Sequence, residues 1–219
     1  IIYNIPLNGM QMIVNNAKKY KFECDLRKQD SFYFSTKKRD NKHIKEEAEF
    51  KEEENFSYEL YNKTTIKNIH PGKNYLIGLR YPGSYGINPF SYCVEMKNLL
   101  LKKGVRIYEN SEVHKVEGNT AKTHIGSVTA KNILICIDKL KAEIDEELSK
   151  KIYHMQTYLA VSEPLNKKEI KTLFPKEELM CWDTRLIYIH YRLVEGNRLI
   201  VGGSTPWATY YPREYHNPK

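Results

Sequence analysis

The segment from Asn88 to Gly104 carries the clearest folding signals in this sequence. Asn88 is a residue type that caps helix N-termini, and Pro89 suits the first helical position, where its missing N–H costs nothing. Gly104 favours the left-handed conformation that ends a helix. Together these residues predict a helix from about 89 to 103.

The residues after this helix are typical of strands joined by turns. Val105–Tyr108 is strand-like, and three short β-segments follow at 111–117, 120–125 and 128–130, as in a meander. Ile133–Ile137 is apolar without polar alternation, which predicts a strand buried on both faces, as in a parallel sheet. These elements follow one another in the order helix, strand, meander and buried strand. This order predicts an α/β fold with part of a doubly wound nucleotide-binding layer.

Further helices and strands are predicted on either side of this region. An apolar stripe from Leu7 to Tyr20 predicts a helix, and the aromatic run Ser31–Ser35 predicts a strand. Lys42–Asn55 predicts a charged helix with Ile44 and Ala48 on its inner side. The same patterns predict strands at Tyr75–Tyr81 and Thr157–Ser162 and a helix at Lys167–Leu173.

Two β-runs near the C-terminal end, Leu186–Val194 and Arg198–Val201, are separated by three turn-forming residues. This spacing predicts a β-hairpin. Alternation along the first run places Tyr188, His190 and Arg192 on one face of the predicted strand.

Composition narrows the classes of function. The chain has 219 residues, of which 41% are hydrophobic, so it can bury a sizeable core. No apolar run approaches the roughly 18–20 residues of a membrane-spanning helix. The net charge is +8, but the basic pairs are short, scattered and interleaved with acids, which argues against a nucleic-acid interface.

The four cysteines, Cys24, Cys93, Cys136 and Cys181, are far apart and form no CxxC pair. This spacing predicts no metal site and favours free, buried thiols in a reducing compartment, so a cytoplasmic location is expected. The sequence begins with Ile1 and shows no leader pattern, and we expect it to be part of a longer protein.

These segments, in this order, resemble the FAD-dependent oxidoreductases of the D-amino-acid oxidase and glycine oxidase superfamily. The resemblance rests on residues 83–92 entering a helix, on 104–117, on 157–164, and on the two segments 181–185 and 198–203. It implies an FAD-binding domain and a substrate domain with a large mixed sheet. Residues 1–79 would form the first part of the substrate domain, 80–150 the middle of the FAD-binding domain, and 151–219 the second part of the substrate domain.

The sequence also departs from this superfamily. None of its 11 glycines forms the GxGxxG loop that holds the FAD pyrophosphate in such proteins. No segment that closes over the flavin precedes the last residue, Lys219, and the run Cys136-Ile137-Asp138 replaces a small, glycine-containing strand end. The expectation is a central fragment that is inactive alone and carries no FAD by itself.

The resemblance implies a set of candidate site residues. Tyr188 and His190 lie near the strand position that offers a polar group beside the substrate, and are the candidate catalytic residues; packing against a helix is the alternative. Arg185 and Arg192 would bind a substrate carboxylate, although Arg192 also suits a solvated strand position. The candidate cofactor contacts are Val113 at the adenine end of FAD and Gly203, Ser204 and Thr205 at the flavin ring. The alternative for Val113 is a position in the core, and the alternative for the other three is an ordinary turn.

Two functions of different classes follow. The first is part of an FAD-dependent oxidoreductase that oxidises the C–N bond of a small amine or amino acid. The second is a basic interaction module that has the same fold but no cofactor. Detection of bound flavin in the full-length protein would favour the oxidoreductase. Binding to an acidic polymer that is lost as salt is added would favour the interaction module.

Overall fold

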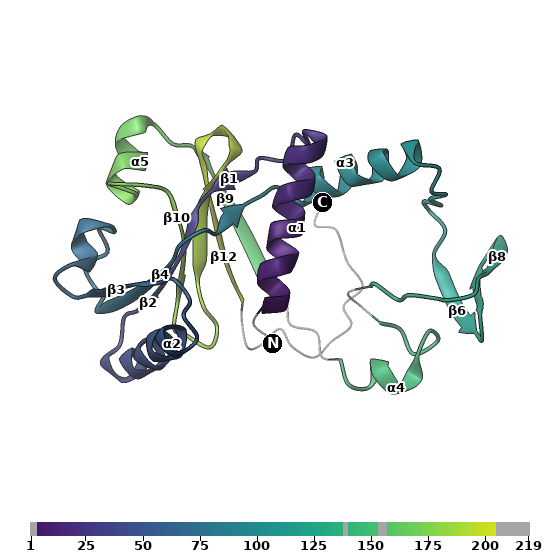
Figure 1. Ribbon diagram of the computed structural model, residues 1–219, viewed down its shortest axis with the longest axis horizontal. Helices are drawn as coiled ribbons and strands as arrows, with labels where there is room; N and C mark the ends of the chain where they lie inside the picture. Colours follow the sequence, from purple (N-terminus) through teal and green to yellow (C-terminus); the bar gives the residue numbers. More distant parts are fainter. Residues whose placement is uncertain (1–3, 138–139, 153–156, 205–219) are drawn as a thin grey trace. The chain divides into compact units, whose positions relative to one another are not determined.

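A computed structural model describes residues 4–137, 140–152 and 157–204 (Figure 1). The chain divides into two compact units. The first contains Ile1–Leu99 and Thr157–Ser204, and the second contains Leu100–Gln156 and Thr205–Lys219. Among the described residues, no helix combines the length and the apolar character that crossing a membrane requires.

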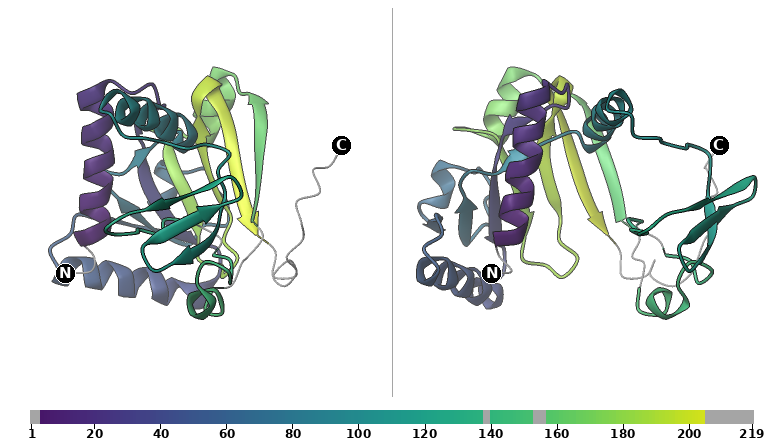
Figure 2. Two further views of the ribbon diagram at one scale, coloured as in Figure 1. Left: turned by 90° about the vertical axis from the view of Figure 1, so that its right-hand side faces the viewer. Right: turned by 45° about the vertical axis from the view of Figure 1, so that its right-hand side comes forward.

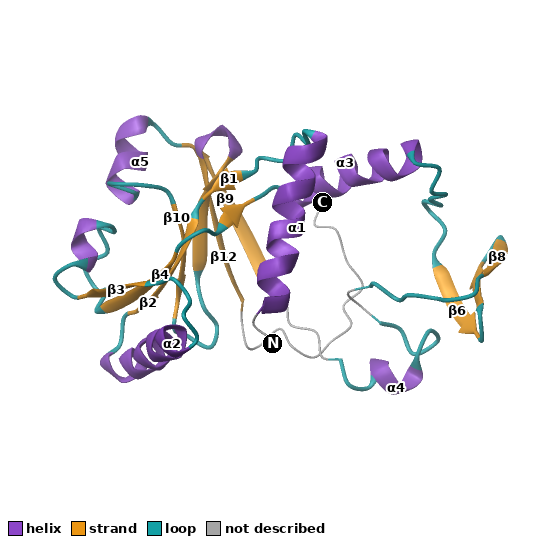
Figure 3. Ribbon diagram, viewed as in Figure 1, coloured by secondary structure: helices purple, strands orange, loops and turns teal. Residues whose placement is uncertain are grey.

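The first unit is built on a seven-stranded mixed sheet, coloured orange in Figure 3. β2 and β10 pair in parallel at its centre, and all other neighbours are antiparallel. The strand order is β3 (Glu59–Asn62), β4 (Ile77–Tyr81), β2 (Asp30–Ser35), β10 (Leu179–Asp183), β11 (His190–Val194), β12 (Arg198–Ser204) and β9 (Thr157–Pro164). This mixed sheet confirms the predicted fold class. β1 (Arg27–Lys28) and β5 (Tyr85–Gly86) pair in a separate two-stranded sheet.

Helices cover both faces of the sheet. Because successive side chains along a strand point to opposite faces, neighbouring residues of a strand pack against different helices. On the face that we call the α5 face, Phe32, Phe34 and Leu179 form the main core with the residues around α5 (Lys167–Leu173) and the short helix η2 (Ile66–Asn68). On the opposite face, the α2 face, the helix α2 (Asn41–Glu53) packs Ile44 and Ala48 against β4. A short helix, η1 (Lys38–Asp40), leads into α2. The inward positions predicted for Ile44 and Ala48 are confirmed.

The predicted helix ends are also confirmed. α1 (Asn4–Tyr20) buries Val14 and Ala17, and α3 (Pro89–Lys102) begins at the predicted cap. The Asn88 side chain accepts a hydrogen bond from the Ser91 N–H at 3.2 Å. At the other end Gly104 has φ +84°, and its N–H and that of Val105 donate to Leu101 and Leu100 (both 3.0 Å), which forms a Schellman motif.

Replacing Asn88 by alanine is expected to lower the free energy of unfolding by about 1 kcal/mol, because the Ser91 N–H loses its acceptor. Thermal unfolding of the two proteins followed by circular dichroism measures the difference. Asn119→Ala is a suitable control, since Asn119 is an exposed turn residue whose amide contacts a carbonyl outside any helix. Equal midpoints for Asn88→Ala and the parent chain would show that the cap contributes nothing.

The second unit contains the predicted meander. β6 (Val113–Glu117), β7 (Thr120–Thr123) and β8 (Gly126–Thr129) form an antiparallel three-stranded sheet, seen in the left view of Figure 2. The short helix α4 (Glu146–Ser149) starts at Asp145, whose carboxylate accepts from the Leu148 N–H at 2.9 Å.

Two predicted strands are wrong. Val105–Tyr108 and Ile133–Ile137 adopt no regular structure, and Leu134 is 87% exposed. A strand needs a neighbour for its N–H and C=O groups, and within the described part of this unit the only sheet is the meander. The parallel strand expected at 133–137 therefore has no partner in the described structure.

The predicted hairpin and thiols need smaller corrections. β11 starts at His190 rather than Leu186, because its partner β10 ends at Asp183 and leaves the intervening residues unpaired. The turn η3 (Glu195–Asn197) joins β11 to β12 as predicted, with Gly196 at φ +73°. All four cysteines are free thiols, but only Cys24 and Cys181 are buried, whereas Cys93 and Cys136 are exposed.

Candidate functional site

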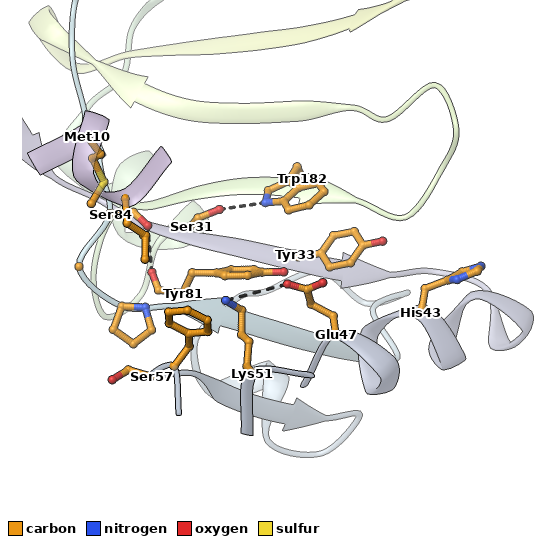
Figure 4. Close-up of a pocket in the computed structure, with 14 residues that line it drawn as sticks. Met10, Ser31, Tyr33, His43, Glu47, Lys51, Ser57, Tyr81, Ser84 and Trp182 are labelled. Carbon is orange, nitrogen blue, oxygen red and sulfur yellow. Dashed lines mark hydrogen bonds and ion pairs between the residues drawn. The ribbon is translucent and has the colours of Figure 1, made fainter. Parts of the chain in front are cut away.

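A cavity of about 730 Å³ opens on the α2 face of the first unit, where aromatic side chains line the sheet (Figure 4). Ser31 and Tyr33 reach it from β2, Tyr81 from β4 and Trp182 from β10. The register explains this grouping, because Tyr33 lies opposite both Leu79 and Trp182 in neighbouring strands. The remaining wall comes from α1, α2, the segment that follows α2 and the turn after β4.

Trp182 is the centre of the aromatic wall. Its indole Nε1 donates to the Ser31 hydroxyl at 2.9 Å, and its ring stacks on Tyr33 with 4.0 Å between centroids. Tyr81 lies 6.4 Å from the same indole, nearly parallel to it. Burial raises the pKa of Tyr33, so this phenol stays neutral and acts as a hydrogen-bonding group rather than a charge.

Two charged side chains of α2 face the cavity from the helix side. Lys51 is only 2% exposed, and its ammonium lies 4.4 Å from the ring centroid of Tyr81 and 5.6 Å from that of Phe56. The nearest Glu47 carboxylate oxygen is 3.9 Å from the Lys51 ammonium. Figure 4 shows both side chains pointing toward the sheet.

The two candidate catalytic residues lie next to this wall. Tyr188 precedes β11 in an irregular segment, yet its ring is 5.5 Å from that of His190 and 6.2 Å from that of Trp182. His190 pairs with Trp182 across the β10–β11 ladder. The structure therefore brings Tyr188, His190 and Trp182 together, although only the first two were singled out from the sequence.

The His190 imidazole lies over Gly202 of β12. A Cβ built on Gly202 would be 2.1 Å from the His190 Nε2 atom, so a larger residue at this position would require the imidazole to move. The Nδ1 atom of His190 is buried and has no hydrogen-bond partner among the residues that the structure describes. A buried imidazole nitrogen without a hydrogen-bond partner is costly.

The candidate cofactor contacts fall in different units. Gly203 pairs with Tyr158 in β9, and a Cβ there would meet no atom nearer than 3.9 Å, so a flat group has room to approach the backbone. Ser204 is the last residue of β12, and Thr205 lies outside the described residues. Val113 opens β6 in the second unit, and its position relative to Gly203 is not part of the described structure.

Both candidate substrate-binding arginines have protein partners. The Arg185 guanidinium pairs with the buried Asp183 carboxylate, with Nε at 2.7 Å. Arg192 donates to the Ile87 carbonyl at 2.7 Å and to the Gln29 amide oxygen at 3.1 Å, and burial lowers its pKa. Arg192 thus holds the segment before α3 against β11, and Arg185 has its charge balanced by Asp183. Their binding of a substrate carboxylate stays a prediction.

Sequence reasoning missed Tyr33, Tyr81, Trp182 and the charged pair of α2. A signal existed for the sheet residues, because alternation along 31–35 and 181–185 places Tyr33 and Trp182 on the faces they occupy. No local pattern reveals that these strands pair, since they are far apart in the sequence. Lys51 is one of many charged residues in a helix whose charges otherwise face solvent.

Comparisons with known proteins identify the family. The sequence model of the FAD dependent oxidoreductases, named DAO, matches residues 7–218. The chain belongs to that family. A Haemophilus influenzae protein described as probable oxidoreductase OrdL is 26% identical over an alignment of 216 residues, and the match covers 93% of this chain and 49% of the relative.

The fold of this FAD-dependent oxidoreductase chain is shared with solved structures. Glycine oxidase from Geobacillus kaustophilus matches with a TM-score of 0.73 at 14% identity, over 90% of this chain and 54% of the enzyme. L-proline dehydrogenase from P. horikoshii matches with a TM-score of 0.71 at 13% identity, over 89% and 53%. The chain spans about half the length of these relatives.

The sheet end of the first unit fits one side of a bound flavin. A Cβ at Gly203 would meet no atom nearer than 3.9 Å, which leaves space for a planar ring beside this backbone. The described residues contain no group of three or more His, Cys, Asp or Glu side chains placed to hold a metal ion.

Proposed function

We propose that this chain is the central part of a longer FAD-dependent oxidoreductase that oxidises the C–N bond of a small amine or amino acid. Its first unit would supply the substrate side of the active site. Support comes from the family membership and from the names of structural neighbours, which include glycine oxidase, L-proline dehydrogenase and L-amino acid deaminase.

The observation that carries this proposal is the grouping of Tyr188, His190 and Trp182, with the His190 ring over Gly202 of β12. The rings of these three residues form an aromatic surface that carries the Tyr188 hydroxyl and the His190 imidazole as polar groups. Such a surface can bind a small polar substrate by hydrogen bonds while its rings keep water away from the reacting carbon.

In this proposal each residue has a defined role. When bound, FAD accepts the two electrons and the hydrogen removed from the carbon next to nitrogen. Tyr188 and His190 would orient the amine by hydrogen bonds so that this C–H bond faces the ring. Gly203 and Ser204 would lie against the ring, and Val113 at the adenine end.

Replacing Tyr188 by phenylalanine or His190 by alanine, one at a time in the full-length protein, tests these roles. At least one change should lower kcat/KM for amine oxidation about tenfold, equivalent to ~1.4 kcal/mol of transition-state stabilisation. Flavin content should be unchanged. Tyr61→Phe, on the edge strand β3, is the matched control and should keep full activity. Full activity in both site variants would mean that this face does not bind the substrate, and loss of flavin in both would indicate core residues.

The chain alone is expected to carry no stoichiometric FAD, because none of its 11 glycines forms a GxGxxG loop for the pyrophosphate. Absorbance of the purified chain in the flavin band measures the occupancy. One FAD per chain would contradict this expectation and would mean that the chain holds the cofactor without a glycine loop.

A further inference from the structure

Three aromatic side chains of the first unit form a series that leads away from the candidate active site. Tyr188 contacts Trp182, with 6.2 Å between ring centroids, and Trp182 stacks on Tyr33, with 4.0 Å between centroids. Figure 4 shows the rings of Trp182 and Tyr33 beside each other on the cavity wall. Tyrosine and tryptophan are among the side chains that lose one electron most readily, so two stacked rings of these kinds can pass an electron between them.

The surroundings of Trp182 keep an oxidised indole reactive. Loss of one electron turns the indole into a radical cation, which becomes a weaker oxidant when a base removes its Nε1 proton. In this protein the Nε1–H donates to the Ser31 hydroxyl at 2.9 Å, and a neutral hydroxyl is a poor base. The radical cation of Trp182 would therefore keep its proton and take an electron from a neighbouring ring.

Tyr33 is a better electron donor to Trp182 than Tyr81 is. Burial raises the pKa of Tyr33, and negative charges around the phenol add to this effect. These charges are the carboxylates of Glu47, Asp40 and Asp183. The same carboxylates stabilise a ring that has lost an electron, because the ring is then positive. Tyr81 is farther from the indole, at 6.4 Å, and the Lys51 ammonium lies 4.4 Å from its ring centroid, which opposes the loss of an electron there.

We propose that Trp182 and Tyr33 form an electron-transfer path that carries an oxidising equivalent away from the candidate active site. In the first step a one-electron oxidant of the peroxyl-radical class takes an electron from Trp182 and, with a proton from water, becomes a hydroperoxide. In the second step Tyr33 gives one electron to the indole radical cation and releases its phenolic proton to solvent in the cavity. Trp182 is then restored, and Tyr33 is left as a neutral phenoxyl radical.

The cavity allows Tyr33 to be reduced again. Tyr33 lines this cavity of about 730 Å³, which is large enough for a small thiol. A thiol that transfers one hydrogen atom to the phenoxyl radical restores the phenol and becomes a thiyl radical. In the complete sequence a thiol reduces the peroxyl radical, and Trp182 is not permanently oxidised. This activity goes beyond the proposed amine oxidation and does not depend on it.

Pulse radiolysis of the purified chain tests the electron transfer directly. In a Trp207→Phe background Trp182 is the only tryptophan, and azide radicals oxidise it preferentially. The absorbance of the indole radical should decay as that of a tyrosine phenoxyl radical grows, at a rate independent of protein concentration. Tyr33→Phe should abolish this conversion, whereas Tyr81→Phe, on the same wall, and Tyr188→Phe, edge-on to the indole, should keep it. Conversion that persists in Tyr33→Phe, or that is lost in either control, would overturn the proposal.

Product analysis tests the protection of Trp182. The chain is exposed to peroxyl radicals with and without 2-mercaptoethanol, at a thiol concentration that leaves the oxidation of free tryptophan unchanged, and oxidised Trp182 is measured by mass spectrometry. The thiol should protect Trp182 in the parent chain and in Tyr81→Phe, and this protection should be lost in Tyr33→Phe. Equal protection in the parent chain and Tyr33→Phe would contradict the path. Neither experiment uses flavin or turnover, so absence of amine oxidation in the full-length protein would contradict the proposed function alone.

Discussion

Replacing Asp30 by alanine is expected to destabilise the first unit by about 3–5 kcal/mol, because it leaves the guanidinium of Arg80 without its buried partner. Asp30 is 2% exposed. One carboxylate oxygen accepts from Arg80 Nε at 2.9 Å, and the other accepts from the Gly83 N–H at 2.9 Å. The same carboxylate raises the pKa of Arg80 against the opposing effect of burial.

Urea unfolding followed by circular dichroism measures this change. Glu177→Ala is the matched control, since Glu177 contacts the same guanidinium at 2.8 Å from a more exposed position, and its loss should cost about 0–1 kcal/mol. Equal effects of the two substitutions would show that burial of Asp30 adds nothing to the strength of the pair.

Acid should destabilise the chain through His70. Burial lowers the pKa of His70 from 6.5 to about 4, since the ring lies among aromatic side chains of the α5 face. Its Nδ1 accepts from the Gly72 N–H at 3.1 Å, so the Nε2 proton is assigned to the hydrogen bond with the Tyr191 hydroxyl at 2.7 Å. The folded chain therefore holds this imidazole neutral.

The sign of the pH dependence follows from that lowered pKa. Between about pH 6.5 and 4 the unfolded chain binds a proton at His70 that the folded chain does not, so stability falls as the pH falls. The full contribution, ~3 kcal/mol, is present above pH 6.5 and is lost toward pH 4. In His70→Asn this component of the slope should disappear, whereas His43→Gln, an exposed histidine, should keep it. Parallel stability curves for the parent chain and His70→Asn would rule out His70 as the titrating group.

Local signals predicted the elements that local contacts stabilise. The cap at Asn88, the glycine at 104 and the turn at 195–197 each act within a few residues, and each is found as expected. The meander is likewise built from neighbouring segments. Because the forces that fix these elements are short-range, the sequence around them was sufficient.

Elements that depend on distant partners could not be predicted in the same way. The run 133–137 has strand composition but finds no neighbour in the described structure, and β10 was not recognised although it occupies the centre of the sheet. The same limit applies to the site. Tyr188 and His190 could be selected from a single segment, whereas the cavity requires β2, β4, β10 and α2 to meet, and only the tertiary pairing specifies that.

The parallel pairing of β2 with β10 has a consequence for how this protein is made. Ser31 and Trp182, which share a hydrogen bond in the finished sheet, are 151 positions apart, and Leu100–Gln156 of the second unit lies between them. A ribosome adding about 5–20 residues per second exposes β2 and its phenylalanines for roughly 10–30 s before β10 emerges. During that interval one edge of β2 has no strand beside it, and contacts of such long sequence separation form slowly. The nascent chain is therefore expected to depend on chaperone protection until the C-terminal strands have been synthesised.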